Sequence, residues 1–191
     1  SSGKQGYAIA QAALDLGAQV TLVSGPTALT APVGAELIPV TSALEMEQAV
    51  LETCEGADAL VMAAAVADFR PKNPPQSKMK RAEGAPTIEL TANPDILKAV
   101  SAQREKSGTP KLLVGFAAES DDLLKNAQGK LKAKGLDLLA ANDISAKDAG
   151  FEVDSNRVLL LDKGGGEEQL ELMSKAEVAR IIMQRVADLL K

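Results

Sequence analysis

The sequence predicts an α/β fold: a doubly wound, mostly parallel sheet with a protruding arm and a C-terminal β-hairpin followed by a helix. Short apolar runs alternate along the chain with segments whose apolar residues recur at helical spacing. Such alternation implies a parallel sheet with helices on both faces and right-handed crossovers. Small residues follow most of the apolar runs, and ligands of such sheets bind beyond the carboxyl ends of the strands. We expect one domain over residues 1–191, with its binding residues in the loops after the strands.

In the first half of the chain, each expected element has its own sequence signal. Apolar residues at helical spacing begin after SSGK and stop at Gly17, and β-type runs follow in QVTLVSG and ELIPV. Ser42 and Glu45 have the spacing of a capping box, which predicts a helix that continues to about Cys54. The continuously apolar ADALVMAAAVADF then predicts a buried strand that runs into a loop.

Residues 69–91 interrupt the alternation. They contain prolines and clustered basic residues, with one β-like run at residues 87–91, and predict an exposed arm or flap. The alternation resumes with a helix that begins at NPDI and a strand in KLLVGFA. A helix in SDDLLKNAQGKLKAKG follows, with acidic residues in its first turn and lysines in its last, and then a strand in LDLLAAND. RVLLLD and EEQLEL predict a hairpin around KGGG, and Ser174 with Glu177 predicts the capping box of a final amphipathic helix.

Composition excludes several classes of function. A net charge of -5 argues against a protein that holds nucleic acid through a broad basic surface. The chain contains no histidine, so histidine-based triads and metal sites are excluded, and lysines, carboxylates and backbone amides must carry any chemistry. The single cysteine, Cys54, cannot form an internal disulfide and is expected to be a small buried thiol at a helix end. Without a membrane-length apolar run or a signal segment, we expect a cytoplasmic protein with no nucleic-acid or membrane partner.

SSGKQG forms the start of the first expected helix. It suggests a phosphate site, although the spacing of a P-loop is absent. One interpretation is a helix cap, in which a serine side chain accepts hydrogen bonds from backbone amides and Gly3 allows a tight turn. The other is an anion site at the exposed amides of the helix start, to which Ser2, Gly3 and Lys4 would contribute if an upstream glycine-rich loop completes it.

Later segments carry further polar candidates. In AAAVADFRP the alanines let a ligand approach the backbone, and Asp68 can accept hydrogen bonds from ribose hydroxyls or an amino group; a capping aspartate on a packed strand end is the alternative. SKMKR places Lys78 and Lys80 on one face of an extended chain, as a lid over a triphosphate requires, although basic loop residues are usually only solvated. Lys130 and Lys134 share one helix face, where the helix dipole alone is a sufficient explanation.

Taken in order, these segments resemble one protein family. The set comprises SSGKQG, AAAVADFRP, the SKMKR lysines, NPDI, GFAAE, the Lys130/Lys134 pair with LDLL, AND, and DSNRVLLLD, and it covers essentially the whole chain. It is similar to the phosphopantothenate–cysteine ligase (phosphopantothenoylcysteine synthetase) domain of bacterial coenzyme A biosynthesis. The resemblance implies a Rossmann-like fold, a homodimer, and an N-terminal phosphopantothenoylcysteine decarboxylase domain in the full-length protein.

The resemblance also implies a reaction. Members of this family use CTP and Mg²⁺ to activate the carboxylate of 4'-phosphopantothenate as an acyl-cytidylate, and the amine of L-cysteine then displaces CMP. Such chemistry relies on positioning and charge stabilisation, which is consistent with a chain that has no histidine. The resemblance identifies no metal ligands.

Residue roles follow from the matched motifs. Lys78 on the flap would be the catalytic lysine that closes over the phosphates, and Lys80 and Arg81 match the basic flap motif. Together with Ser2, Gly3 and Lys4, the residues implied in nucleotide binding are Met62, Ala63, Ala64, Asp68, Lys80, Asn93, Pro94, Asp95, Ile96, Phe116, Lys130 and Lys134. In the family a glycine-rich strand-loop and an asparagine precede SSGK, so the resemblance implies that residues 1–191 lack the first strand of the sheet.

Two other functions compete with this one. A non-catalytic nucleotide-binding module of the same fold would need the pocket but has less need of a lysine-bearing lid. An NAD(P)-dependent oxidoreductase is disfavoured because the chain has no G-x-G-x-x-G, and because Tyr7 is followed four residues later by Gln11 in place of a lysine.

Overall fold

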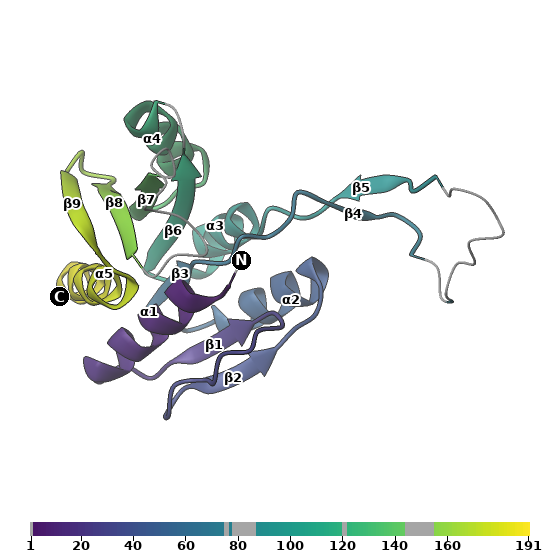
Figure 1. The fold of residues 1–191 in the computed structure, drawn as a ribbon, viewed down its shortest axis with the longest axis horizontal. Coiled ribbons are helices and arrows are strands. Elements are labelled where there is room, and N and C mark those ends of the chain that lie inside the picture. The colour runs from purple at the N-terminus through teal and green to yellow at the C-terminus, as the bar shows by residue number, and fades with distance from the viewer. Residues whose placement is uncertain (1, 75–76, 78–86, 120–121, 144–154) are drawn as a thin grey trace.

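The computed structural model describes residues 2–74, 77, 87–119, 122–143 and 155–191. Its main sheet has five strands in the order β3-β6-β7-β8-β9 (Figure 1). These strands are β3 (Ala59–Met62), β6 (Leu112–Glu119), β7 (Leu138–Asp143), β8 (Ser155–Asp162) and β9 (Glu167–Ser174). The first three run parallel, and β8 and β9 form the C-terminal antiparallel hairpin. The predicted α/β sheet with a terminal hairpin is therefore confirmed.

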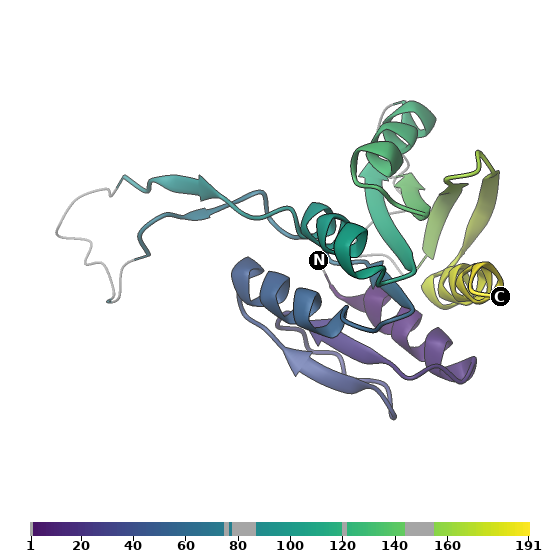
Figure 2. The same cartoon turned by 180° about the vertical axis from the view of Figure 1, so that it is seen from behind.

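Helices cover both faces of the sheet because β6 buries side chains on both sides. Val114 packs into a cluster with residues of α1 (Lys4–Asp15) and α5 (Lys175–Leu189). Leu113 packs into a second cluster with residues of α2 (Ala43–Thr53), α3 (Ile96–Ser107) and α4 (Leu123–Ala133). Figures 1 and 2 show the two helix layers from opposite sides.

A separate pair of parallel strands, β1 (Thr21–Ser24) and β2 (Glu36–Pro39), lies between α1 and α2 (Figures 1 and 2). Val23 of β1 packs against the same cluster as Leu60 of β3. Val20, just before β1, packs against the same cluster as Val61 of β3. β1 and β3 therefore belong to one layer, although among the described strands β1 pairs only with β2 and β3 pairs only with β6.

The expected arm projects away from the rest of the molecule (Figures 1 and 2). Its described part contains β4 (Phe69–Pro71) and β5 (Leu90–Ala92), which pair antiparallel with Phe69 opposite Ala92. The pairing continues outward, because the amide of Lys72 donates to the carbonyl of Glu89 at 2.9 Å and their side chains form an ion pair at 2.6 Å.

Several helix boundaries follow the capping signals in the sequence. Ser42 caps α2 by accepting a hydrogen bond from the amide of Glu45 at 3.2 Å, but the carboxylate of Glu45 accepts from the amide of Thr41 at 2.7 Å, so only the serine half of the predicted capping box is seen. Ser174 with Glu177 forms a complete capping box on α5. The predicted acidic first turn of α4 is wrong, because Asp122 is the N-cap residue and the first turn contains no acidic side chain. The strand expected from residue 57 ends at Met62, since residues 63–67 belong to neither a helix nor a strand.

Cys54 lies where it was expected. It is the C-cap residue of α2 and is 2% exposed. Burial raises the pKa of its thiol to about 11, because a thiolate would lose its hydration there.

A buried carboxylate, Asp137, joins elements at the amino-terminal edge of the sheet. It is 3% exposed, directly before β7, and accepts hydrogen bonds from the amide of Leu113 at 2.8 Å and from the side chain of Lys163 at 2.5 Å. Arg104 of α3 pairs with the same carboxylate and donates to the carbonyl of Gly135 at 2.8 Å. Burial alone would raise the pKa of Asp137, but the hydrogen bonds from Lys163, Leu113 and Arg104 outweigh it and hold the pKa below its usual value.

We expect Asp137→Asn to lower the free energy of unfolding by about 2 kcal/mol or more, because it removes the charge that Arg104 and Lys163 surround. Urea denaturation at neutral pH measures the change. Asp58→Asn is the matched control, since Asp58 pairs with Lys111 at 2.7 Å but is largely exposed, and it should have almost no effect.

The same variant has a pH signature. Because the folded-state pKa of Asp137 is depressed, its contribution to stability is present above the unfolded pKa of about 4 and is lost as the pH falls through the lower folded pKa. Between about pH 5 and pH 2, the parent should therefore lose stability more steeply than Asp137→Asn. Equal slopes for the two proteins would contradict this account.

Candidate functional site

The carboxyl ends of the parallel strands meet at one edge of the sheet. In the ladder register, Met62 lies opposite Gly115 and Ala118 lies opposite Asn142. The start of α1 reaches the same edge, because a Cβ atom added at Gly6 would lie 3.8 Å from the Cβ atom of Ala63. SSGK and the alanine-rich stretch, which are distant in the sequence, are therefore neighbours in the fold.

The start of α1 presents backbone amides. Gly3 is the N-cap residue with a φ of 76°, a left-handed conformation that favours glycine, and it has no side chain with which to cap the helix. The hydroxyl of Ser2 accepts a long hydrogen bond of 3.5 Å from the amide of Lys4. The amide of Tyr7 makes the first intrahelical bond, to the carbonyl of Gly3 at 3.0 Å, so the preceding first-turn amides have no intrahelical acceptor. Such a helix start can bind an anion.

Asn93 and Arg70 hold the base of the arm. The backbone amide of Asn93 donates to the carbonyl of Asp68 at 2.8 Å, and its Nδ2 donates to the carbonyl of Ala67 at 2.8 Å. Arg70 donates to Oδ1 of Asn93 at 3.1 Å and to the carbonyl of Ala92. Asn93 thus uses its side chain within the protein, whereas Asp68 is exposed.

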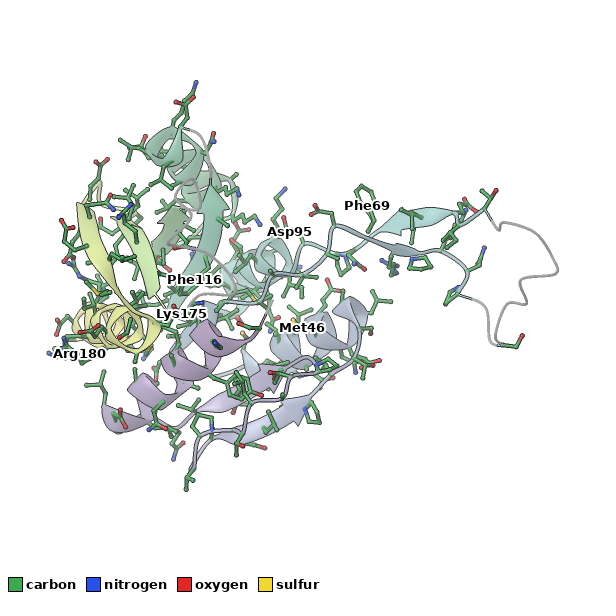
Figure 3. The ribbon with its side chains drawn as sticks, viewed as in Figure 1. Met46, Phe69, Asp95, Phe116, Lys175 and Arg180 are labelled. Atoms are coloured by element: carbon green, nitrogen blue, oxygen red, sulfur yellow. The ribbon has the colours of Figure 1, made fainter. Side chains whose placement is uncertain are left out.

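Asp95 connects the start of α3 with the end of α4. It is the N-cap residue of α3, and its side chain accepts a hydrogen bond from the amide of Lys98 at 3.3 Å. Its carboxylate also lies 3.7 Å from Nζ of Lys134, the C-cap residue of α4. Lys130 belongs to the last turn of α4. Figure 3 shows Asp95 near the base of the arm and Phe69 farther out on it.

The remaining predicted residues lie on two faces of the sheet. Phe116 of β6 packs against the cluster with α1 and α5, whereas Met62 and Ile96 are buried in the cluster with α2, α3 and α4. Ala64 is exposed and Pro94 is half-buried. A ligand that contacts all of these residues must therefore lie across the edge of the sheet and not on one face.

The structure brings the start of α1 together with Ala63, and residues 93–95 together with Asp68 and Lys134. Lys78, Lys80 and Arg81 lie outside the described residues. Within the described ranges, no three acidic or cysteine side chains are grouped so that they could hold a metal ion. None of the helices in those ranges is long and apolar enough to cross a membrane.

Two buried asparagines near the site were not among the predicted residues. Asn142 of β7 and Asn156 of β8 are 9% and 5% exposed, and the Oδ1 atom of each has no hydrogen-bond partner in the described part of the structure. Buried acceptors are normally paired, so both are unusual. Asn142 stands out as a polar residue at the end of the apolar run LDLLAAND, but nothing in the sequence links Asn156 to α1.

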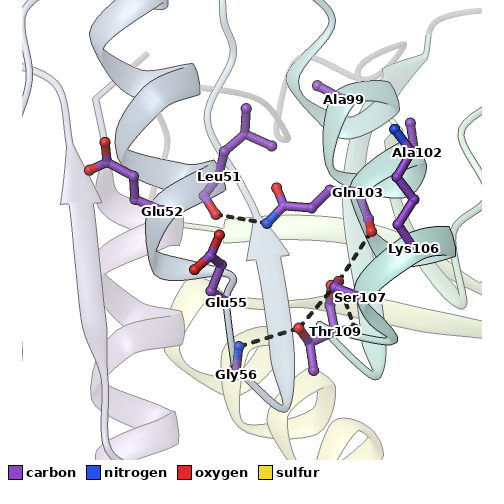
Figure 4. A pocket seen from close by; sticks show the side chains of 10 residues that line it. All are labelled: Leu51, Glu52, Glu55, Gly56, Ala99, Ala102, Gln103, Lys106, Ser107 and Thr109. Carbon is purple, nitrogen blue, oxygen red and sulfur yellow. Dashed lines mark hydrogen bonds between the residues drawn. The ribbon is translucent and has the colours of Figure 1, made fainter.

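A hollow of about 650 Å³ lies between α2 and α3, at the opposite edge of the sheet (Figure 4). Its polar groups bond to one another: Nε2 of Gln103 donates to the carbonyl of Leu51 at 3.1 Å, and the amide of Gly56 donates to the hydroxyl of Thr109 at 3.3 Å. None of the predicted site residues lines it. We therefore place the candidate site at the strand ends.

Asp95→Ala should lower the free energy of unfolding by about 1 kcal/mol, because α3 loses its N-cap. Asp95→Asn should retain most of this stability, since asparagine caps a helix about as well as aspartate. Thermal denaturation of the two variants distinguishes the contribution of the helix cap to stability from that of the ion pair with Lys134. If Asp95→Asn destabilises the protein as much as Asp95→Ala, the ion pair is the larger contribution.

Comparisons with known proteins match the whole chain to one family. Residues 1–190 match the family described as "DNA/pantothenate metabolism flavoprotein C-terminal domain". The Coenzyme A biosynthesis bifunctional protein CoaBC of Bacillus subtilis (strain 168) is 46% identical over 192 residues, which cover 100% of this chain and 46% of that protein. The protein of the same name from Mycobacterium tuberculosis (strain ATCC 25618 / H37Rv) is 46% identical over 198 residues, which cover 100% of this chain and 47% of that protein. The chain spans about half the length of the curated relatives it matches.

Solved structures agree with this match. The crystal structure of the C-terminal domain of Coenzyme A biosynthesis bifunctional protein CoaBC is 38% identical, has a TM-score of 0.82, and is matched over 100% of this chain and 84% of that chain. The DNA/pantothenate metabolism flavoprotein from Streptococcus pneumoniae is 20% identical, with a TM-score of 0.81 over 99% of this chain and 89% of that chain, and supports the fold alone. The family resemblance in the sequence is therefore confirmed, and the chain belongs to the family of the DNA/pantothenate metabolism flavoprotein C-terminal domain.

Proposed function

We propose that this chain catalyses the ligation of 4'-phosphopantothenate to L-cysteine in coenzyme A biosynthesis. The observation that carries the proposal is the match of the whole chain, at 46% identity, to a bifunctional protein of coenzyme A biosynthesis. The 38% identity to the solved C-terminal domain of such a protein supports it. Among the described motifs, SSGKQG lies against the alanine-rich stretch at Ala63, and NPDI lies against Lys134 through Asp95, which also supports the proposal.

The proposed reaction has two steps. The carboxylate of 4'-phosphopantothenate attacks the α-phosphorus of CTP, which releases pyrophosphate and leaves an acyl-cytidylate. The amine of L-cysteine then attacks the acyl carbon, so that an amide bond forms, CMP leaves and the amine loses a proton. Both steps place negative charge on phosphate oxygens, which amides and lysines can stabilise without a histidine.

We assign the phosphates of the nucleotide to the amides after Gly3 and to the cationic side formed by Lys130 and Lys134. Lys134 already lies 3.7 Å from the carboxylate of Asp95, so an arriving phosphate would compete for it. The exposed Asp68 would contact the ribose or the base. Lys78, between β4 and β5, would close over the phosphates as a lid.

Mg²⁺ would bind together with the triphosphate of the nucleotide. Magnesium usually keeps several waters and binds through substrate phosphates together with one or two carboxylates. Because the described residues provide no cluster of three metal-binding side chains, no residue of the chain is assigned to it.

We also propose that a strand preceding Ser1 completes the sheet between β1 and β3. β3 contributes to both core clusters, β1 contributes Val23 to one and is preceded by Val20, which packs against the other, and β2 contributes to neither; β1 is therefore the member of its pair that lies toward β3. A strand inserted there would run parallel to both and lead into SSGK at the candidate site. The domain would then be single and continuous, with the arm as its one large projection.

The arm is also the surface that we assign to homodimerisation. Phe69, Ile88 and Leu90 are 61%, 56% and 56% exposed. A two-stranded ribbon is marginally stable in water by itself, and exposed large apolar side chains mark interaction surfaces. Pairing with the arm of a second copy would cover these side chains.

In the full-length protein, we propose that a phosphopantothenoylcysteine decarboxylase domain precedes this chain. The chain corresponds to 46% of the Bacillus subtilis bifunctional protein, which leaves room for a second domain of similar size. A cytoplasmic location follows from this biosynthetic role, and a buried, unpaired cysteine is consistent with a reducing compartment.

The test of the ligase proposal is pyrophosphate release by the chain joined to its preceding segment. Given 4'-phosphopantothenate, Mg²⁺ and one of CTP, ATP, GTP or UTP, the protein should strongly prefer CTP, and sustained turnover should require cysteine. The chain without the preceding segment should be much less active. If the complete protein releases no pyrophosphate with any of the four nucleotides, the proposal is contradicted and a non-catalytic nucleotide-binding module is favoured.

Within this assay, Lys78→Ala should lower turnover by about two orders of magnitude or more, because it removes a charge that stabilises the transition state. Lys72→Ala is the matched control, since Lys72 lies on the same arm but pairs with Glu89 at 2.6 Å. Turnover of Lys78→Ala close to that of Lys72→Ala would remove Lys78 from the mechanism.

The dimer proposal predicts that Phe69→Ser with Leu90→Ser raises the dissociation constant of the dimer by at least about tenfold, because two apolar anchors are lost. Sedimentation velocity over a concentration series measures this. Leu16→Ser is the control, since Leu16 is 47% exposed but belongs to the end of α1, away from the arm. Equal dissociation constants for the parent and the double variant would exclude the arm as the interface.

A further inference from the structure

Two hydrogen bonds connect the first turn of α1 to α5 and to β8. Nε2 of Gln5 donates to the backbone carbonyl of Lys175 at 3.2 Å. Nδ2 of Asn156 donates to Oε1 of Gln5 at 3.2 Å. Gln5 is the second residue of α1, so the connection holds the turn whose amides face the candidate site.

The chemistry of these groups determines how the side-chain amides of Gln5 and Asn156 are oriented. A backbone carbonyl only accepts hydrogen bonds, so the amide of Gln5 must turn its Nε2 toward Lys175 and its Oε1 toward Asn156. Asn156 must then turn its Nδ2 toward Gln5. The Oδ1 atom of Asn156 therefore points away from Gln5, and it is buried without a partner in the described part of the structure.

The carbonyl that accepts from Gln5 belongs to a buried and fully capped helix start. Lys175 is 7% exposed and is the first residue of α5. The capping box of Ser174 and Glu177 fixes this helix start, with hydrogen bonds of 3.2 Å and 3.0 Å between them. Gln5 thus ties a helix start without a side-chain cap to one that has a complete cap.

Packing alone does not explain this arrangement. A buried acceptor without a partner costs stability, and an apolar side chain at the position of Asn156 would avoid that cost. The cost is understandable if the position of the first turn matters for binding. The next residue, Gly6, lies where an added Cβ atom would be 3.8 Å from Ala63, so a shift of the turn would also change the spacing of the site.

We propose that Gln5 and Asn156 are positioning residues, which hold the first-turn amides of α1 in the geometry that binds a phosphate of the nucleotide. The inference rests on the proposed function, because it takes the phosphate-bearing ligand from there. Neither side chain needs to contact the reacting atoms.

The first test uses the protein with its preceding segment and the double variant Gln5→Met/Asn156→Leu, which replaces both amides by apolar groups of similar size. Its melting temperature should equal or exceed that of Gln5→Met alone, because the unpaired amide is gone. Its dissociation constant for CTP, measured by calorimetry well below that temperature, should be about tenfold or more higher than that of the parent. A stable double variant with parental affinity would overturn the inference, because a merely structural role predicts that outcome.

The second test needs no nucleotide. The amide of Tyr7 makes the first intrahelical bond of α1, so its hydrogen exchange reports how well the first turn is held. It should exchange about tenfold faster in the double variant than in the parent. Gln11→Met is the matched control, since Gln11 lies on the same helix and donates only to Asp15, at 2.8 Å, among the described residues; it should leave the exchange unchanged.

The two tests separate this inference from the proposed function. A parent protein that neither binds nor uses CTP would overturn the proposed function, and the exchange of Tyr7 would then decide the inference alone. A parent that turns over normally, with unchanged affinity and exchange in the double variant, would overturn the inference and leave the function intact.

Discussion

The burial of β6 on both faces is the constraint on which the rest of the molecule depends. Leu113 and Val114 are neighbours in the chain, are both fully buried and point to opposite sides of the sheet, so each side needs its own layer of helices. At Gly115 an added Cβ atom would lie 2.7 Å from Cδ1 of Leu136, so a larger residue there would force this buried side chain, just before β7, to shift. Gly115 lies opposite Met62 of β3 and Leu139 of β7, and the ends of these strands form the edge at which we place the candidate site.

Local patterns predicted the elements wherever a short stretch of chain determines them. The capping serines Ser42 and Ser174 start helices as expected, because the residues that complete each cap lie within one turn. The hairpin of β8 and β9 was also predicted, since a glycine-rich turn joins two apolar-patterned runs. The acidic first turn of α4 was not, because Asp122 takes a left-handed conformation with a φ of 45° ahead of the helix.

The partners of polar side chains could not be predicted, because they come from distant parts of the chain. Asn93 matched a nucleotide-binding motif, yet its side chain bonds to Arg70, which lies in AAAVADFRP but had no role predicted for it. The sequence likewise named Phe116 and Met62 as members of one site without indicating that they face opposite sides of the sheet. The motifs therefore named candidate segments, and the structure was needed to show which of the described ones are neighbours and which bonds their side chains make.

The single thiol gives the molecule an internal reporter of local motion. Cys54 is 2% exposed, and with a pKa raised to about 11 it is almost entirely protonated at neutral pH, so alkylating reagents cannot reach a reactive thiolate in the closed state. The next residues, Glu55 and Gly56, line the hollow between α2 and α3. The rate at which Cys54 is alkylated therefore measures how often this corner opens, and a change in that rate when ligand binds at the opposite edge would reveal communication through β3 and β6.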